Sequence, residues 1–295
     1  MALPTTIWYI LFCFLPMFGL IIAFKNYKIT GGKSFIYNLF HSDWAGFKNF
    51  SFLIRSNDLF VILRNTILYN LAFIALGMVF SVGLAIMISL MRNKRASKVY
   101  QTMMFFPYFM SWVVASYFLD AFLNQDNGLI NSILRNAGKE PIQWYMSAGV
   151  WPFILIFMYL WKSTGYNMVI YLSSISGIDT TLYEAAVMDG ANKRQQVWHI
   201  TLPCLKSVII MMFILNVGKV FYSDFGLFFQ LSQGASGSIF KTTATIDTYV
   251  YNALQSSTPI GMTSAATFFQ SVACCITILL ANAIVKKIDE DSAII

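Results

Sequence analysis

The residues best suited to chemistry lie in one polar segment and at a few polar positions inside long apolar runs. The segment TLYEAAVMDGANKRQQVWHITLP, residues 181–203, carries two acidic residues, two basic residues and a histidine. It can offer charge and small side chains for docking to a partner. In the apolar run that follows, Asn216, Lys219 and Tyr222 supply an amide, an amine and a phenol, which hydrogen-bond well to hydroxyl groups.

Catalytic and metal-binding patterns do not emerge from the sequence. The two histidines, His41 and His199, lie far apart in different loops, and no nucleophile–base pair or cluster of metal ligands stands out. The chain has no GxxxxGK[ST] phosphate loop. The four cysteines lack CxxC spacing and fit as small apolar side chains. We therefore expect a protein that is not an enzyme, binds no metal and does not hydrolyse ATP by itself.

The composition indicates that these residues are carried by membrane-spanning helices. Of the 295 residues, 57% are hydrophobic and only 11% are charged, whereas soluble domains carry about 25% charged residues. The net charge of +7 comes from basic residues scattered among loops, which does not favour nucleic-acid binding. The chain is long enough for about six spans but not for a separate large soluble domain. We predict one all-α polytopic transmembrane domain over residues 1–295.

Six apolar runs are near the length of about 20 residues that a bilayer core requires. Because backbone polar groups must be paired inside lipid, each run should be helical. The first is a retained span rather than a cleaved signal peptide, with Pro16 and Gly19 expected to bend it. The predicted spans are residues 5–24, 66–90, 103–123, 150–171, 204–229 and 264–285.

Local signals divide the polar segment into two short helices. Thr181 followed by Glu184 resembles a capping box that would start a helix at Leu182, and Gly190 can end it in the left-handed conformation. A second short helix would follow, and Pro203 would reset the chain into the fifth span. The segment could also be a connector without a partner. A DNA-binding helix-turn-helix is disfavoured because the adjacent spans leave no room for a duplex.

The polar residues inside the spans are candidates for a substrate pathway. Asn216, Lys219 and Tyr222 would share one face of the fifth span, followed by Asp224. The alternative is structural: Lys219 would snorkel or pair with Asp224, and Asn216 would bond a neighbouring helix. Weaker candidates are Tyr69 and Asn70 in the second span, and Lys162 and Asn167 in the fourth.

Two further patterns concern packing and orientation. In the second span, Gly77, Ser81, Ala85 and Ser89 recur every four residues, which allows another helix to approach closely. Lysine and arginine are balanced between the two sets of loops, so the positive-inside rule alone does not decide the orientation. The densest basic cluster, RNKRASK at residues 92–98, favours the cytoplasm for its side.

The polar segment resembles the EAA loop of binding-protein-dependent ABC importer permeases. That pattern is EAA, three residues, G, nine residues, I, one residue and LP, and every position is matched by Glu184-Ala185-Ala186, Gly190, Ile200 and Leu202-Pro203. Other stretches, including FLPMFGLIIAFKNYKI and IDTYVY, are similar to the lipoprotein-linked or aldouronate-type branch that transports polysaccharide-derived sugars. The resemblance implies six spans in the type I importer permease fold.

The resemblance also implies partners and roles. The EAA loop would be a cytoplasmic coupling helix that docks into an ATPase subunit through Glu184, Ala185, Ala186, Asp189 and Gly190. Glu184 could cap its own helix or pair with a basic ATPase residue. The implied partners are a second related permease forming a heterodimer, two cytoplasmic ATPase subunits that bind ATP and Mg, and an extracellular substrate-binding lipoprotein.

The implied function is import of oligosaccharides across the bacterial plasma membrane, with the EAA loop and the C-terminus cytoplasmic. The alternative from another class is a self-sufficient secondary transporter or channel for a small polar solute. Such a protein would have inverted repeats and broken helices and would need no partner. No convincing repeat relates the two halves of the sequence.

Overall fold

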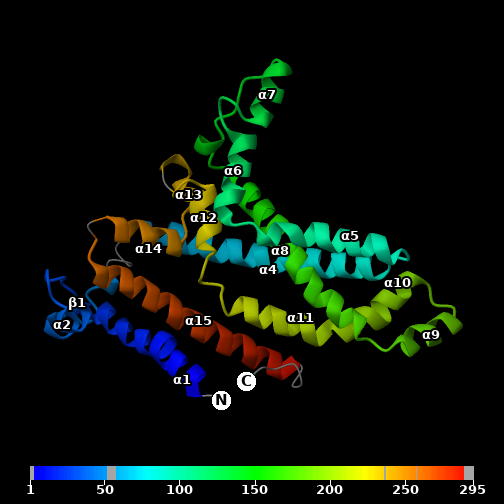
Figure 1. Cartoon of the computed structure of the whole chain (residues 1–295), viewed down its shortest axis with the longest axis horizontal. Helices are drawn as coiled ribbons and strands as arrows, with labels where there is room; N and C mark the ends of the chain where they lie inside the picture. The colour runs from blue at the N-terminus through cyan, green and yellow to red at the C-terminus, as the bar shows by residue number, and fades with distance from the viewer. Residues whose placement is uncertain (1–2, 52–57, 236, 257, 289–295) are drawn as a thin grey trace.

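The computed structural model describes residues 3–51, 58–235, 237–256 and 258–288, and most of these lie in helices (Figure 1). The sheet in this part of the chain consists of β1 (Lys25–Asn26) paired antiparallel with β2 (Asp43–Trp44). Among the described residues, five helices are long and apolar enough to cross a membrane, and one bent pair can supply a sixth crossing. The predicted all-α polytopic architecture is confirmed.

Two long helices form the centre of the molecule. α4 (Leu59–Ser89) packs along α8 (Trp151–Ser176), and the predicted small-residue face of α4 lies in this contact. Ala85 is fully buried, and the Ser81 hydroxyl donates to the Thr164 carbonyl at 3.4 Å. The expected close approach of a second helix is therefore confirmed.

The first span changes helix type along its length. It runs from Leu3 to Phe24 as α1 (Leu3–Tyr9), the π-helical η1 (Ile10–Phe14) and the 3-10 helix η2 (Leu15–Phe24). Pro16 lies in the first turn of the 3-10 segment, directly after the π-helical turn. Proline has no backbone N–H, so the regular series of α-helical hydrogen bonds is interrupted here. The η2 segment packs against the last span, α15 (Ile260–Ile288).

The second span begins earlier than the predicted boundary at residue 66. α4 starts at Leu59 and includes Arg64 and Asn65, whose polarity hid this first part of the helix. Both side chains donate to the Lys241 carbonyl, and Asn65 also donates to the Ala244 carbonyl at 2.9 Å. These polar groups are thus paired with another part of the chain.

The predicted third span over residues 103–123 is wrong as a single straight helix. The chain forms α5 (Lys94–Phe105) and η3 (Phe106–Phe109), then turns by 99° into α6 (Trp112–Leu123). Pro107 is the second residue of the 3-10 turn, and the Ser111 hydroxyl caps α6 by accepting from the Val114 N–H. A proline and an N-cap residue at this spacing end one helix and start another.

The predicted fifth span over residues 204–229 is also wrong at both ends. A continuous helix runs from Lys193 to Val217, through α10 (Lys193–Gln196), the π-helical η5 (Val197–Thr201) and α11 (Leu202–Val217). Pro203 does not reset the chain, because the preceding turn is π-helical: the Leu202 N–H bonds the Val197 carbonyl five residues back.

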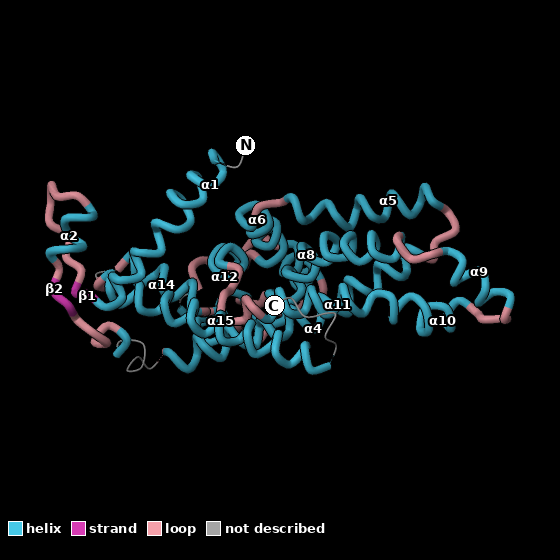
Figure 2. Tube along the Cα trace, turned by 90° about the horizontal axis from the view of Figure 1, so that it is seen from below, coloured by secondary structure: helices cyan, strands magenta, loops and turns pink. Residues whose placement is uncertain are grey.

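The remaining elements lie at the ends and sides of this bundle. Figure 1 shows α6 and α7 projecting away from the body, and both views place α2 and α9 at opposite ends of the molecule (Figure 2). The shorter elements are α2 (Phe35–His41), α7 (Leu129–Asn136), η4 (Trp144–Met146), α9 (Thr180–Met188), α12 (Phe225–Leu231), η6 (Gly237–Ile239), α13 (Phe240–Thr243) and α14 (Ile246–Gln255).

Candidate functional site

The helix predicted over the EAA segment is present as α9, but a different residue caps it. The Asp179 carboxylate accepts from the Thr181 N–H at 2.9 Å, so α9 begins at Thr180 rather than Leu182. This hydrogen bond holds the pKa of Asp179 below its usual value. The expected capping box of Thr181 with Glu184 is therefore wrong. Asp179 forms the N-cap because it lies at the turn out of α8 and has the extended backbone that an N-cap requires.

Gly190 ends α9 as the sequence predicts. Its φ of +79° lies in the left-handed region, and a Cβ built there would meet no other atom within 4 Å. The Ala191 N–H bonds the Ala186 carbonyl at 2.8 Å, and the Gly190 N–H bonds the Val187 carbonyl at 3.0 Å. This pair of bonds is the Schellman motif. Glycine is needed here for its backbone conformation and not for space.

The turn after Gly190 is fastened to the base of the fifth span. Asn192 and Gln195 form a capping box that starts α10. The buried Gln196 donates to the Ala191 carbonyl at 3.2 Å, and the Tyr183 hydroxyl contacts the Thr201 hydroxyl at 2.9 Å. These bonds connect both sides of the turn and hold α9 and the start of the long helix together as one piece.

The outer surface of this piece is open. Glu184, Ala185, Asp189 and Gly190 are exposed, while Ala186 is half-buried. Several large apolar side chains on the same segment are exposed as well: Leu182, Val187, Met188 and Trp198. The Glu184 carboxylate makes no hydrogen bond or ion pair within the described part of the chain. Its possible role as a cap is thereby removed, which leaves it available to a partner.

The basic cluster of residues 92–98 lies at the same end of the molecule as α9. Lys94 and Lys98 line a cavity of about 520 Å³ together with Thr180 and Tyr183. The two segments are separated by the whole of α8 in the sequence. Their proximity agrees with the expectation that both face the same side of the membrane.

The predicted polar face of the fifth span does not form. α11 ends at Val217, so Lys219, Tyr222 and Asp224 lie beyond the helix and do not continue the face of Asn216. The Asn216 amide donates to the Met212 carbonyl of its own helix at 2.7 Å. The Tyr222 hydroxyl contacts the Ser271 hydroxyl on α15 at 2.8 Å. Gly218, the residue after α11, packs closely against α15. A Cβ at this position would lie 2.8 Å from the Ile278 side chain, so only glycine fits without a shift.

Two candidates on α4 bind backbone carbonyls of distant segments. The buried Tyr69 donates its hydroxyl to the Thr242 carbonyl at 2.6 Å. The Asn70 amide donates to the carbonyls of Val220 and Tyr222 at 3.1 and 2.8 Å. Asn70 thus supplies hydrogen bonds to backbone carbonyls of the irregular segment that follows α11. Both side chains position other elements.

A cluster of aromatic and charged side chains surrounds the bend between α5 and α6. The Lys162 ammonium donates to the Tyr108 carbonyl at 2.8 Å and lies 5.2–5.3 Å from the ring centres of Tyr108 and Trp112. The Trp112 N–H donates to the Asp224 carboxylate at 2.7 Å, and Tyr166 stacks on Tyr108 at 4.4 Å. Pro107 and Ser111 mark the bend, and they are the sequence features that could have located this cluster.

The structural alternative predicted an ion pair between Lys219 and Asp224, and this pair does not form in the described part of the chain. Lys162 does not form an ion pair with Asp224 either. In the described part of the chain the ion pair found is Lys28 with Asp43. Asp224 instead caps α12 by accepting from the Leu227 N–H and holds Trp112 with its second oxygen. The carboxylate therefore fixes α12 against α6.

Asn167 and Asn216 line the same narrow polar cavity. The cavity measures about 20 Å³, and its lining also includes Tyr159 and Tyr171. That space is close to what one water molecule occupies. The structure therefore brings together two predicted pathway residues from the fourth and fifth spans.

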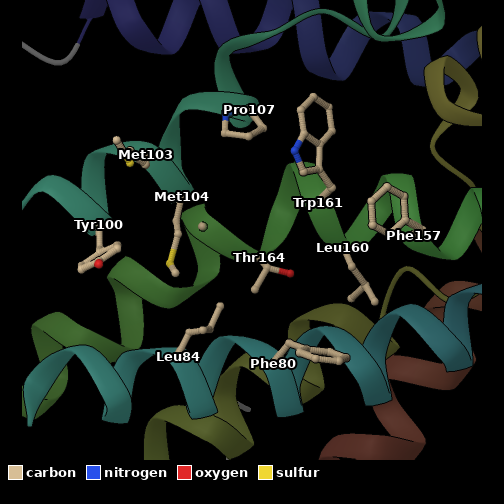
Figure 3. A pocket seen from close by; sticks show the side chains of 11 residues that line it. Phe80, Leu84, Tyr100, Met103, Met104, Pro107, Phe157, Leu160, Trp161 and Thr164 are labelled. Carbon is tan, nitrogen blue, oxygen red and sulfur yellow. The ribbon is translucent and has the colours of Figure 1, made fainter. Parts of the chain in front are cut away.

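A larger cavity lies elsewhere and is apolar. It measures about 580 Å³ and lies between α4, α5 and α8. Figure 3 shows Phe80, Leu84, Met104 and Trp161 around it, with Thr164 pointing inward. Its lining is mostly apolar and offers few of the hydrogen-bonding groups that a sugar needs. The described residues also contain no group of three His, Cys, Asp or Glu side chains able to hold a metal ion.

Comparison with known families agrees with this geometry. Residues 81–290 match the family model described as the binding-protein-dependent transport system inner membrane component. The chain belongs to this family. It is therefore a membrane permease component of an ABC importer, a transport subunit and not an enzyme, and the EAA motif in α9 is characteristic of the family.

Two curated relatives from Bacillus subtilis (strain 168) match nearly the whole chain. The polygalacturonan/rhamnogalacturonan transport system permease protein YteP is 32% identical over 291 residues, which cover 99% of this chain and 88% of YteP. Protein LplB is 31% identical over 295 residues, which cover 99% of this chain and 89% of LplB.

A solved structure confirms the type I importer permease fold. It is a chain from a bacterial ABC transporter involved in the import of the acidic polysaccharide alginate, with a TM-score of 0.85 and 28% identity. The match covers 97% of this chain and 94% of the other. A second structure of the alginate transporter, in complex with its alginate pentasaccharide-bound periplasmic protein, has a TM-score of 0.84 and 28% identity and covers 97% of this chain and 92% of the other.

Proposed function

We propose that this permease is one of two related membrane subunits of an importer that brings oligosaccharides derived from polysaccharides into a bacterial cell. The observation that carries the proposal is the rigid attachment of α9 to the start of the long helix Lys193–Val217. A helix with an open surface, held firmly at the end of membrane-spanning helices, can convert the movement of a partner into a tilt of those helices.

The partners of this surface are two cytoplasmic ATPase subunits, which bind ATP and Mg. The docking surface consists of Glu184, Ala185, Ala186, Asp189 and Gly190, together with the exposed apolar side chains of α9. The small side chains allow close approach, and Glu184 is free to pair with a basic residue. This assignment places α9, the basic cluster at residues 92–98 and the end of α15 in the cytoplasm. The C-terminus, expected on the same side, lies outside the described residues.

Movement of the ATPases would reach the membrane helices as a rigid-body rotation. The helix from Lys193 to Val217 has no break, and Tyr183 and Thr201 link it to α9. A push on α9 therefore acts on α8 and α11 together. The far end of α11 stops at Val217, where the chain becomes irregular and can open or close a path.

A second permease and an extracellular substrate-binding lipoprotein complete the assembly. α6 projects from the body and exposes Val113, Tyr117 and Phe118, so this chain leaves an apolar surface for another membrane subunit. The alginate transporter was solved in complex with a substrate-loaded periplasmic protein. We assign the corresponding role to a lipoprotein that delivers the oligosaccharide to the face opposite α9.

The side chains around the bend fit an acidic oligosaccharide. Sugar rings bind aromatic faces through their C–H groups, and Tyr108 and Trp112 offer such faces beside the Lys162 ammonium. A carboxylate on the sugar would pair with Lys162. The names of the relatives, which refer to polygalacturonan and alginate, support this substrate class. Asn216, Asn167, Lys219 and Tyr222 would supply further contacts along the path, while Tyr69, Asn70 and Asp224 position it.

The experiment that tests the importer begins with purification of the protein and its associated subunits from native membranes. The assembly is then reconstituted into vesicles with the binding lipoprotein. We expect uptake of oligosaccharide only when ATP and Mg are supplied on the side of α9. Uptake by this subunit alone, without ATP, would support the secondary transporter instead.

A substitution tests the substrate class. Lys162→Gln should raise the KM for an acidic oligosaccharide by about tenfold, because a hydrogen bond to a charged group contributes about 1.5–3 kcal/mol. The KM for a neutral oligosaccharide should change little. Lys139→Gln, an exposed lysine after α7, serves as the charge-matched control. An equal rise in KM for the acidic and the neutral oligosaccharide would show that Lys162 does not recognise the carboxylate. The assignment of the chain to an importer would not be affected.

A further inference from the structure

The segment from Lys25 to Phe50 forms a small folded unit, here called the β1–β2 unit, at the end of the molecule opposite α9. It contains β1, α2 and β2, and Figures 1 and 2 both place it beyond the ends of the long helices. The coupling function does not use it. Its surface is unusual in both polarity and charge.

The polarity of α2 is inverted relative to a helix on a water-exposed surface. Its one buried residue is Asn38, whereas Phe35, Ile36 and Phe40 are 52%, 64% and 75% exposed. Ile36 and Phe40 are four residues apart and so share one face. A helix in water would bury these side chains and expose the asparagine. The pattern fits a unit whose surroundings are apolar.

The polar groups of the unit are paired internally. Asn38 accepts from the Thr30 N–H at 3.3 Å, and the Ser42 hydroxyl donates to the Asn38 carbonyl at 2.6 Å. The Asn49 amide donates to the carbonyls of Ala23 and Lys25, both at 2.9 Å. Such internal pairing is required where water is scarce. It also makes the unit a defined structure rather than a loose loop.

The exposed aromatic surface continues directly from two membrane spans. Phe24, the last residue of η2, stacks on Trp44 at 6.1 Å and meets Phe47 edge-on at 5.6 Å. On its other side it contacts Phe268 of α15 at 5.2 Å. Trp44 and Phe47 are 65% and 77% exposed. Aromatic residues at the end of a span are typical of the membrane–water boundary.

The charge of the unit is positive. Within it Asp43 is the one acidic residue, and its lysines are Lys25, Lys28, Lys33 and Lys48. The ion pair between Lys28 and Asp43 is long, at 3.8 Å, and exposed to solvent. Lys33 lies over the Tyr37 ring at 5.1 Å, with its charge near the aromatic surface. Lysines that border an aromatic surface suit the phosphates of lipid headgroups.

We propose that the β1–β2 unit is an interfacial anchor that binds anionic phospholipids on the membrane face opposite α9. Ile36, Phe40, Trp44 and Phe47 enter the boundary between headgroups and acyl chains, and Lys28, Lys33 and Lys48 bind the phosphates. The anchor holds the ends of η2 and α15 at a fixed depth while the coupling end moves. This inference does not depend on the transported substrate.

Depth measurements in lipid nanodiscs test the apolar part of the proposal. The protein is purified with its associated subunits after its four cysteines are replaced by alanine, and a nitroxide is attached at Phe40→Cys or Phe47→Cys. We expect the label to be more accessible to oxygen than to a water-soluble nickel chelate. Phe12→Cys in the first span provides the lipid reference, and Lys139→Cys in the exposed loop after α7 provides the aqueous one. Accessibility like that of Lys139→Cys would overturn the proposal.

A second measurement avoids the cysteine replacements. The fluorescence difference between the native protein and Trp44→Phe isolates the emission of Trp44, which is then quenched with brominated phosphatidylglycerol or brominated phosphatidylcholine. We expect quenching several-fold stronger with the anionic lipid, and loss of this preference when Lys28, Lys33 and Lys48 are all replaced by glutamine. Equal quenching by both lipids would overturn the selectivity. Protection of Trp44 that depends on a protein partner would show that this face is a subunit contact and overturn the anchor.

Discussion

The two ends of α11 are built in opposite ways. At its first residue the helix continues without a break into η5 and α10, and from there it is fastened to α9. At its last residue, Val217, the helix stops. The following backbone is held by side chains from three other elements: Asn70 on α4, Asp247 on α14 and Gln270 on α15.

From this difference we infer transmission of movement at the first end of α11 and gating at the second. A continuous helix carries a displacement along its length, whereas a segment held by individual hydrogen bonds can exchange those bonds and change shape. The Gln270 amide donates to the Phe221 carbonyl at 2.9 Å, and the Ser223 N–H donates to the Asp247 carboxylate at 2.6 Å. We therefore expect substitutions at the two ends to have different consequences. Those near α9 should affect coupling, and those around residues 218–224 should affect stability and substrate affinity.

The largest effect is expected at Gly190. Gly190→Val places a β-branched residue at a φ of +79°, although the side chain itself meets no neighbour. The left-handed conformation costs a residue of this kind roughly 1–2 kcal/mol, so the end of α9 should shift. We expect transport per ATP hydrolysed to fall by about tenfold. The measurement compares uptake with ATP hydrolysis in the same vesicles.

Gly138→Val is the matched control. Gly138 has a φ of +71° and equally open surroundings, but it follows α7 and lies far from α9 in the fold. The substitution should produce a similar local strain and leave the ratio of transport to hydrolysis unchanged. If both variants uncoupled to the same degree, the effect would be one of general stability and the comparison between the two ends of α11 would fail.

An intermediate effect is expected at Asn70. Asn70→Ala leaves the carbonyls of Val220 and Tyr222 without their donor, which costs about 1–3 kcal/mol. Thermal unfolding in detergent should shift by about 2–4 °C for each kcal/mol. Asn216→Ala removes a bond that stays within one helix, so its shift should be much smaller. A larger shift of the unfolding temperature for Asn216→Ala would contradict a stabilising role for the two hydrogen bonds from Asn70.

The smallest effect is expected at Asp179. Its pKa is lowered in the folded protein by the hydrogen bond from the Thr181 N–H, so the cap is fully formed above the unfolded pKa of about 3.9 and is lost as the pH falls through the folded value. Asp179→Asn keeps an acceptor but should abolish this dependence, and Asp179→Ala should loosen α9 at every pH. The mobility of a spin label at Leu182→Cys reports the change. An identical acid response in the native protein and Asp179→Asn would assign it to another group.

Local sequence signals were enough for the features that depend on neighbouring residues. The long apolar runs indicated the spans, the four-residue spacing of Gly77, Ser81 and Ala85 indicated a packing face, and Gly190 indicated the end of the coupling helix. The EAA spacing led to the family, which the comparison confirmed. The capping error at Thr181 shows the limit of such signals, since Asp179 competed for the same turn.

Only the tertiary structure decided where polar groups inside the membrane find their partners. Trp112 and Asp224 are separated by 112 positions, and Asn70 and Tyr222 by 152. The sequence by itself determined the membrane helices and the coupling motif, because hydrophobic length, glycine conformation and helix spacing act over a few residues. The end of α11 and the cluster around Lys162 depend on hydrogen bonds between distant segments, which exist only once the helices have packed.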